Sequence, residues 1–140
     1  YMDGHSLTPV IRNDTPIRDY ALFGIFGGHI CITDGRYVYM RSCKDPENQP
    51  LYEYTAMPCH MDRPFSREEM SEAELFKVPV HHSTDSYRFG TMLFDLLTDP
   101  EQKCPIHDSN IEDHLCQAMK KMMKDNQAPK EQFERIGLTE

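Results

Sequence analysis

The sequence lacks any apolar run long enough to cross a bilayer as a helix. Its longest apolar run, residues 20–26, is far shorter than the roughly 20 residues that such a helix needs, and no positively charged start precedes an apolar segment. Positive charge is also scarce, with 15 Lys and Arg against 23 Asp and Glu, a formal net charge of −8. We expect no membrane partner, because no spanning or export segment is visible, and no nucleic acid, because an acidic surface repels phosphates.

Cysteines are few and irregularly spaced. The sequence has five, an odd number, which disfavours a complete disulfide framework and is typical of a reducing compartment. This pattern favours the cytoplasm. The compartment stays open, because a targeting segment could precede Tyr1.

The usual signatures of an active site are missing too. We find no Gly-x-Ser-x-Gly elbow, no phosphate-binding glycine loop and no His-Glu-x-x-His pair. One set resembles zinc ligands: Cys104, His107, His114 and Cys116. Positions 114 and 116 lie about 200° apart around a helix, so their side chains cannot readily face one ion. The sequence therefore predicts neither a catalytic residue nor a metal site in this chain.

What the sequence does contain is a strong hairpin signal at residues 29–41. Two runs of β-branched and aromatic residues flank Asp34-Gly35, a pair typical of a type I′ turn with two positive-φ positions. The alternation along the second run predicts Tyr37 and Tyr39 on one face of the sheet, with Val38 and Met40 on the other. Neighbouring strands must complete the sheet.

The remaining strands are predicted from composition. Residues 20–26 are almost continuously apolar, as in a strand buried on both faces, and Gly27-Gly28 then turns the chain into the hairpin. Residues 51–56 have the composition of a fourth antiparallel strand of a meander, and residues 91–97 of a strand that returns to the sheet. The predicted class is α+β, with a four- to five-stranded antiparallel sheet packed against a C-terminal helix.

Helices are predicted from their start signals and periodicity. A short helical segment is predicted at 6–11, broken near Pro9. A capping box at Ser66 predicts a helix through about Phe76, which Pro79 ends. Residues 80–88 are predicted to be a loop. A second capping box predicts a helix that begins near Ser109 and covers one sheet face. The apolar residues of this helix form a stripe at helical spacing: Ile111, Leu115, Ala118, Met119, Met122. A last short helix over 129–136 is predicted with Phe133 and Ile136 as its buried anchors.

Three stretches, taken in order, resemble the C-terminal part of sulfatases of the alkaline phosphatase superfamily. Residues 2–7 (Met-Asp-Gly-His-Ser-Leu) look like the Asp-Gly-x-Ser-Leu that follows the last core helix of that family. Residues 20–41 are similar to the family segment on the product side of the C-terminal sheet. Residues 92–101 resemble its Leu-Tyr-Asp-Leu, two residues, Asp-Pro strand before the terminal helix.

The resemblance implies a division of labour between two parts of one polypeptide. A larger N-terminal domain would hold the formylglycine, the calcium ion and the catalytic residues, and 1–140 would be a C-terminal subdomain in which 1–19 end the catalytic domain and its linker. The chain alone would be inactive and hold no cofactor, and the parent would hydrolyse a sulfated small molecule or sugar. Cys59 and Arg63 outline the family's nucleophile motif, but Met61 replaces the expected Pro or Ala, so we interpret this match as chance.

We expect three residues to face substrate in the parent enzyme: His29, His60 and Arg63. His29 follows two glycines at a strand end, where a ligand can approach closely. His60 and Arg63 lie in a loop bounded by prolines, and an arginine there can pair with a sulfate or carboxylate. Each has an ordinary alternative role: a histidine at a strand end often satisfies a backbone carbonyl, and an arginine in an acidic chain often meets Asp or Glu.

Other functions stay open at this point. The chain could be an independent binding or interaction module, a small metal-binding protein, or part of a phosphoester or phosphonate-ester hydrolase of the same superfamily. An upstream Cys/Ser-x-Pro/Ala-x-Arg motif would favour the sulfatase, whereas a reading frame starting near Tyr1 would favour the module.

Overall fold

The structure is a computed structural model that describes residues 4–56, 75–81 and 84–138. Its six strands and four helices are β1 (Ala21–Gly24), β2 (Ile30–Thr33), β3 (Tyr37–Arg41), β4 (Tyr52–Ala56), β5 (Leu75–Pro79), β6 (Met92–Asp95), α1 (Thr8–Asn13), α3 (Ser86–Phe89), α4 (Ser109–Asp125) and α5 (Lys130–Arg135). No helix in these ranges has the length and apolar character needed to cross a membrane.

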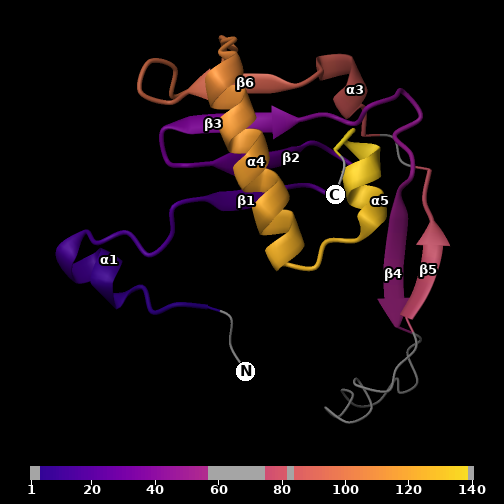
Figure 1. Cartoon of the computed structure of the whole chain (residues 1–140), viewed down its shortest axis with the longest axis horizontal. Helices are drawn as coiled ribbons and strands as arrows, with labels where there is room; N and C mark the ends of the chain where they lie inside the picture. Colours follow the sequence, from indigo (N-terminus) through magenta and orange to yellow (C-terminus); the bar gives the residue numbers. More distant parts are fainter. Residues whose placement is uncertain (1–3, 57–74, 82–83, 139–140) are drawn as a thin grey trace.

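The predicted α+β class is confirmed. Strands β1, β2, β3 and β6 form one antiparallel sheet in that order (Figure 1). The first three strands are a meander, and β6 pairs with β3, with Val38 opposite Phe94. The predicted fourth strand at 51–56 exists as β4, but it pairs with β5 in a separate two-stranded sheet, so its place in the meander was wrong.

Two predictions for residues 66–88 need correction. The helix expected to run to Phe76 does not, because Leu75–Pro79 is the strand β5, while residues 66–74 lie outside the described part of the chain. The predicted loop 80–88 contains the start of the short helix α3, whose first turn is capped by the Asp85 carboxylate accepting a hydrogen bond from Arg88 N at 3.0 Å.

At the N-terminus, α1 is not broken by Pro9. The proline sits in the first turn of α1, where the missing N–H would have had no partner within the helix. None of the residues of α1 is buried, and the helix lies to the side of the sheet beyond β1 (Figure 1).

Strand β1 is an edge strand and is not buried on both faces as predicted. Within the described chain it pairs with β2 alone. Phe23 is 49% exposed, and Ile25, just after the strand, is 72% exposed. An apolar run is therefore compatible with an edge strand whose outer side chains remain exposed in the described part of the chain.

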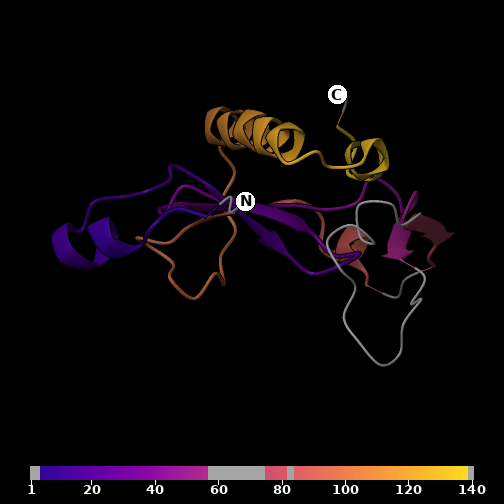
Figure 2. The same ribbon diagram turned by 90° about the horizontal axis from the view of Figure 1, so that it is seen from below.

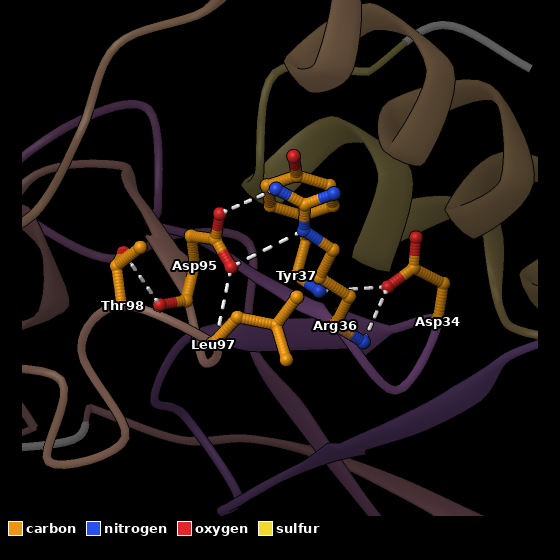
Figure 3. A network of polar contacts seen from close by, with 6 residues as sticks. All are labelled: Asp34, Arg36, Tyr37, Asp95, Leu97 and Thr98. Carbon is orange, nitrogen blue, oxygen red and sulfur yellow. Dashed lines mark hydrogen bonds and ion pairs between the residues drawn. The ribbon is translucent and has the colours of Figure 1, made fainter.

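The turn between β2 and β3 differs from the predicted type I′. Gly35 has a φ of 93°, but Asp34 is not among the residues with positive φ. Instead, the Asp34 carboxylate accepts hydrogen bonds from the backbone N–H groups of Arg36 and Tyr37, at 2.9 and 2.7 Å (Figure 3). An aspartate that bonds its own following backbone makes an Asx-type turn, which needs only one positive-φ residue.

A polar network then ties this turn to the end of β6. Arg36 donates from Nη2 to Asp95 Oδ2 at 2.8 Å and from Nε to Oδ1 at 3.3 Å, and Leu97 N donates to Oδ1 at 3.0 Å (Figure 3). The hydrogen bond from Arg36 holds the pKa of Asp95 below its usual value. The network fixes the register of the β3–β6 pair at one end of the sheet.

The core lies between the sheet and α4, which covers one face as predicted (Figure 2). Ile32 and Tyr39 from the sheet meet Leu115 and Met119 from the helix, and each of the four is at most 2% exposed. The helix begins at Ser109, but Asp108 supplies the cap by accepting from Asn110 N and Ile111 N. The anchors predicted for the last helix are also buried: Phe133, Ile136.

Candidate ligand cleft

An apolar cleft of about 460 Å³ opens on the molecule near the turn between β1 and β2. This volume lies within the range of small-molecule sites in proteins, which are mostly apolar with a few polar groups. Its walls come from the end of β1, the following turn, β2, β3 and the segment that carries α3: Phe23, Gly24, Ile25, Gly28, His29, Cys31, Met40, Thr84, Asp85, Ser86, Phe89.

The cleft lies on the face of the sheet opposite α4. Phe23 pairs with Cys31 across β1 and β2, and Cys31 pairs with Met40 across β2 and β3. Their neighbours Ile32 and Tyr39 pack against α4, and successive side chains of a strand point to opposite faces. The row Phe23, Cys31 and Met40 therefore forms a floor that α4 leaves open.

His29 stands at the edge of this cleft, between the glycine turn and the first residue of β2. Its Nε2 lies 2.8 Å from Gly90 O, and because a carbonyl oxygen only accepts, the proton of this bond is on Nε2. In the neutral ring Nδ1 is then an acceptor, and it makes no hydrogen bond within the described chain. The ring thus has both features considered from the sequence: it satisfies a backbone carbonyl and it lines a cleft.

The other two predicted site residues cannot be placed beside His29. His60 and Arg63 lie outside the described residues. Their predicted role in substrate binding stays a prediction.

Close backbone approach explains the glycines around His29. A Cβ atom on Gly24 would lie 2.5 Å from the carbonyl oxygen of His29, and one on Gly28 would lie 2.8 Å from Ile25 Cγ1. Both contacts are too short for a real side chain. Glycine at these positions therefore lets the turn fold tightly beneath the histidine.

The α3 side of the cleft is held by a buried serine. Ser86 is 2% exposed, and its Oγ donates to Cys43 Sγ at 3.2 Å and accepts from Cys43 N at 3.3 Å. The side chains that follow Ser86 in α3 are exposed, and Phe89, three residues further on, is 65% exposed beside the cleft. The α3 side of the cleft is therefore anchored by the buried Ser86 and presents the exposed apolar ring of Phe89.

The thiol in the cleft floor is not an activated nucleophile. Cys31 is 3% exposed, and burial raises the pKa of its thiol to about 11. The reactive form of cysteine is the thiolate, which is scarce at neutral pH when the pKa is this high. The cleft can bind an apolar ligand, and among its described lining residues no base and nucleophile are arranged for covalent catalysis.

A buried polar network supports the turn from below. Arg135 Nη1 donates to Gly28 O at 3.1 Å and to Asn48 Oδ1 at 2.9 Å, and Asn48 Nδ2 donates to Gly27 O at 2.7 Å. Arg135 and Asn48 are 2% and 3% exposed. The network joins α5 and the loop before β4 to the glycine turn that carries His29.

The residues weighed as zinc ligands do not meet in the described structure. His114 Nε2 lies 2.8 Å from the hydroxyl oxygen of Tyr20, and His107 lies beside Glu112, with Nδ1 3.7 Å from Oε1. Cys104 is exposed, and no group of three or more His, Cys, Asp or Glu side chains suited to an ion occurs in the described ranges.

Sequence reasoning missed most of the cleft. The apolar run that contains Phe23 and Ile25 predicts a strand buried on both faces, and Phe89 follows a predicted loop. Alternation along β1 could have separated an inner from an outer face. Nothing in the sequence marks Arg135 as buried, because an arginine on a short amphipathic helix is usually solvated.

Comparisons with known proteins add no assignment: no family model, curated protein or solved structure matches the chain. Function is therefore argued from the sequence and from the geometry of the cleft.

Proposed function

We propose that this chain is the C-terminal subdomain of a sulfatase-type enzyme that hydrolyses sulfate esters. In this proposal it contributes its fold and the cleft beside His29 to the substrate pocket, and the N-terminal domain of the same polypeptide supplies the catalytic centre. The observation that carries the proposal is the position of His29. A residue in a stretch that resembles the family lines a 460 Å³ cleft of apolar character.

The arrangement of the resembling stretches supports the same proposal. Residues 20–41 form β1 to β3, and residues 92–101 begin with β6. These stretches are separated in the sequence, yet β3 and β6 are hydrogen-bonded neighbours in one sheet. Segments that belong to one family pattern are expected to share one structural unit.

The chemistry of the cleft suits binding and orientation of the organic part of an ester. Phe23, Met40 and Phe89 offer apolar contact, and His29 Nδ1 can accept a hydrogen bond from a substrate hydroxyl. Calcium and formylglycine are implied for the parent by the resemblance and would act on the sulfate group in the other domain. The residues of this chain would hold the ester and exclude water.

Exposed apolar side chains beside the cleft fit a surface that another domain covers. Phe23, Ile25 and Phe89 are each at least 49% exposed and line the same cleft. Contiguous exposed apolar groups of this kind commonly mark an interaction site. In the proposal, the catalytic domain packs beside them and closes the substrate pocket.

The test is His29→Ala in the full-length parent, with His107→Ala as a matched control. The His107 side chain is 89% exposed and does not line the cleft. We expect kcat/KM on the true substrate to fall about tenfold for His29→Ala, the size of a lost hydrogen bond of roughly 1.4 kcal/mol, and to stay unchanged for the control. His60→Ala and Arg63→Ala are measured alongside.

A small aryl ester that does not fill the cleft serves as a second substrate. Its kcat/KM should fall less than that of the true substrate when His29 is replaced. If folded His29→Ala keeps both values of the wild-type parent, the cleft is not part of the substrate pocket.

An independent binding module is the alternative, because the described lining of the cleft combines apolar side chains with a few polar groups, as small-molecule sites do. The coding sequence decides between the two. A Cys/Ser-x-Pro/Ala-x-Arg motif some hundreds of residues upstream supports the enzyme, and its absence supports the module. A phosphoester or phosphonate-ester hydrolase of the same superfamily is distinguished by assaying the parent on matched sulfate and phosphate esters.

A further inference from the structure

We propose that Arg135 and Gln132 bind a small oxyanion, such as a sulfate or a carboxylate, in a hollow between α5 and the turn after β1. This anion hollow is a second concavity of about 330 Å³, and its walls are the segment from Leu22 to Gly27 with His29, Ile30, Gln132 and Arg135. It lies next to the ligand cleft and shares part of β1 and the glycine turn with it. The inference does not depend on the proposed sulfatase function.

The first argument is the burial of a charge without a counter-charge. Arg135 is 2% exposed, and within the described chain no carboxylate forms an ion pair with it. Its partners are neutral: carbonyl oxygens of Gly27 and Gly28, Asn48 Oδ1, and Gln132 Oε1, which accepts from Nε at 3.1 Å. A buried cation held only by neutral acceptors retains a large attraction for an anion.

The second argument is the unused half of the guanidinium. Nε and Nη1 make all the hydrogen bonds of Arg135, so the two N–H groups of Nη2 have no partner in the described chain. In these ranges, Asp45 Oδ1 is the one fully buried side-chain polar atom without a hydrogen-bond partner. Because Nη2 also has no partner there and is not such an atom, it keeps some access to the surface. Arg135 lines the anion hollow, and in the proposal these N–H groups donate to an oxyanion within it.

Neighbouring groups suit an oxyanion as well. Gln132 accepts from Arg135 with Oε1, which leaves its amide N–H₂ as a donor on the same wall of the hollow. Guanidinium and amide donors together match the several acceptor oxygens of sulfate or carboxylate. Neutral carbonyls hold the guanidinium in place beforehand, so binding would require little rearrangement.

Binding is tested by NMR on the 140-residue chain labelled with ¹⁵N, titrated with sodium sulfate at constant ionic strength set by sodium chloride. The Nε–H resonance of Arg135 is assigned by its absence in Arg135→Lys. We expect this resonance to shift in a saturable manner, and the same site to take sodium acetate. Because sulfate would also be a product of the proposed parent enzyme, the acetate titration tests the hollow independently of that function.

Three variants give the controls. Gln132→Leu keeps the buried guanidinium and should weaken sulfate binding about tenfold, while Arg135→Lys should abolish saturable shifts of the backbone N–H groups around the hollow. Arg12→Gln, which removes an exposed arginine on α1, should bind sulfate like the wild type. Absence of a saturable shift in folded wild-type protein, or equal binding by wild type and Gln132→Leu, would overturn the proposal.

Discussion

Leu115→Ala should be strongly destabilising, because it empties the centre of the contact between α4 and the sheet. Leu115 is fully buried and packs in the core cluster with Ile32 and Tyr39. The change removes about three carbon atoms, worth roughly 0.8 kcal/mol each in transfer free energy, and leaves a cavity whose cost comes on top. We expect the free energy of unfolding to fall by about 3–4 kcal/mol, and the melting temperature by roughly 10 °C.

Leu97→Ala is the matched control, since the same atoms are removed from a side chain that is 74% exposed. Its effect should stay within about 0.5 kcal/mol. Both proteins are unfolded with urea and followed by circular dichroism at 222 nm, which reports the loss of α4. If Leu115→Ala costs less than about 1 kcal/mol, or no more than the control, α4 does not cover the sheet as described.

Three further predictions concern the turn, the acid limb of stability and activity. Gly35→Val should lower the free energy of unfolding by about 1–3 kcal/mol because φ is 93° there, and Gly35→Asn by less; equal melting temperatures for glycine and valine would contradict the turn geometry. Hydrogen bonds from Lys77 and Tyr54 lower the pKa of Glu131 to about 2. The stability that Glu131 contributes is therefore present above pH 4.5 and is lost as the pH falls towards 2. Thermal melts of Glu131→Gln should depend less on pH in this window than those of the wild type. The isolated chain should hydrolyse neither aryl sulfates nor phosphate esters, and turnover that tracks the purified chain and disappears with Cys59→Ala would refute this.

Local signals explain the parts of the fold that could be predicted. The alternation in β3 placed Tyr39 and Met40 on opposite faces, and the helical spacing from Leu115 onward identified the buried stripe of α4. Both patterns depend on burial along a single element. These patterns therefore identify the buried side of a strand or helix without information on which element packs against it.

Pairing between distant segments could not be read in the same way. The composition of β4 predicts a strand, but its partner is β5, a segment far along the chain whose first residues the capping box at Ser66 predicts as the end of a helix. Tertiary pairing overrides local propensity in such cases.

The same limit applies to the candidate sites. His29 was predicted because glycines precede it, which is a local signal. Phe89 and Arg135 lie far along the chain from the glycine turn and meet it only in the folded structure. Their surroundings therefore depend on tertiary packing, which a local pattern does not reveal.

The separate β4–β5 sheet makes this fold tolerant of changes in length at one place. Val80 N donates to Leu51 O at 2.9 Å and closes the base of the hairpin, while Asn48 and Ser86 anchor the flanking chain in buried contacts. The β3–β6 pair belongs to the other sheet and shares no strand with this hairpin. Doubling the length of a flexible loop costs only about 0.6 kcal/mol in loop-closure entropy. We therefore expect this chain to tolerate a lengthened connection between β4 and β5 while the four-stranded sheet keeps its pairing.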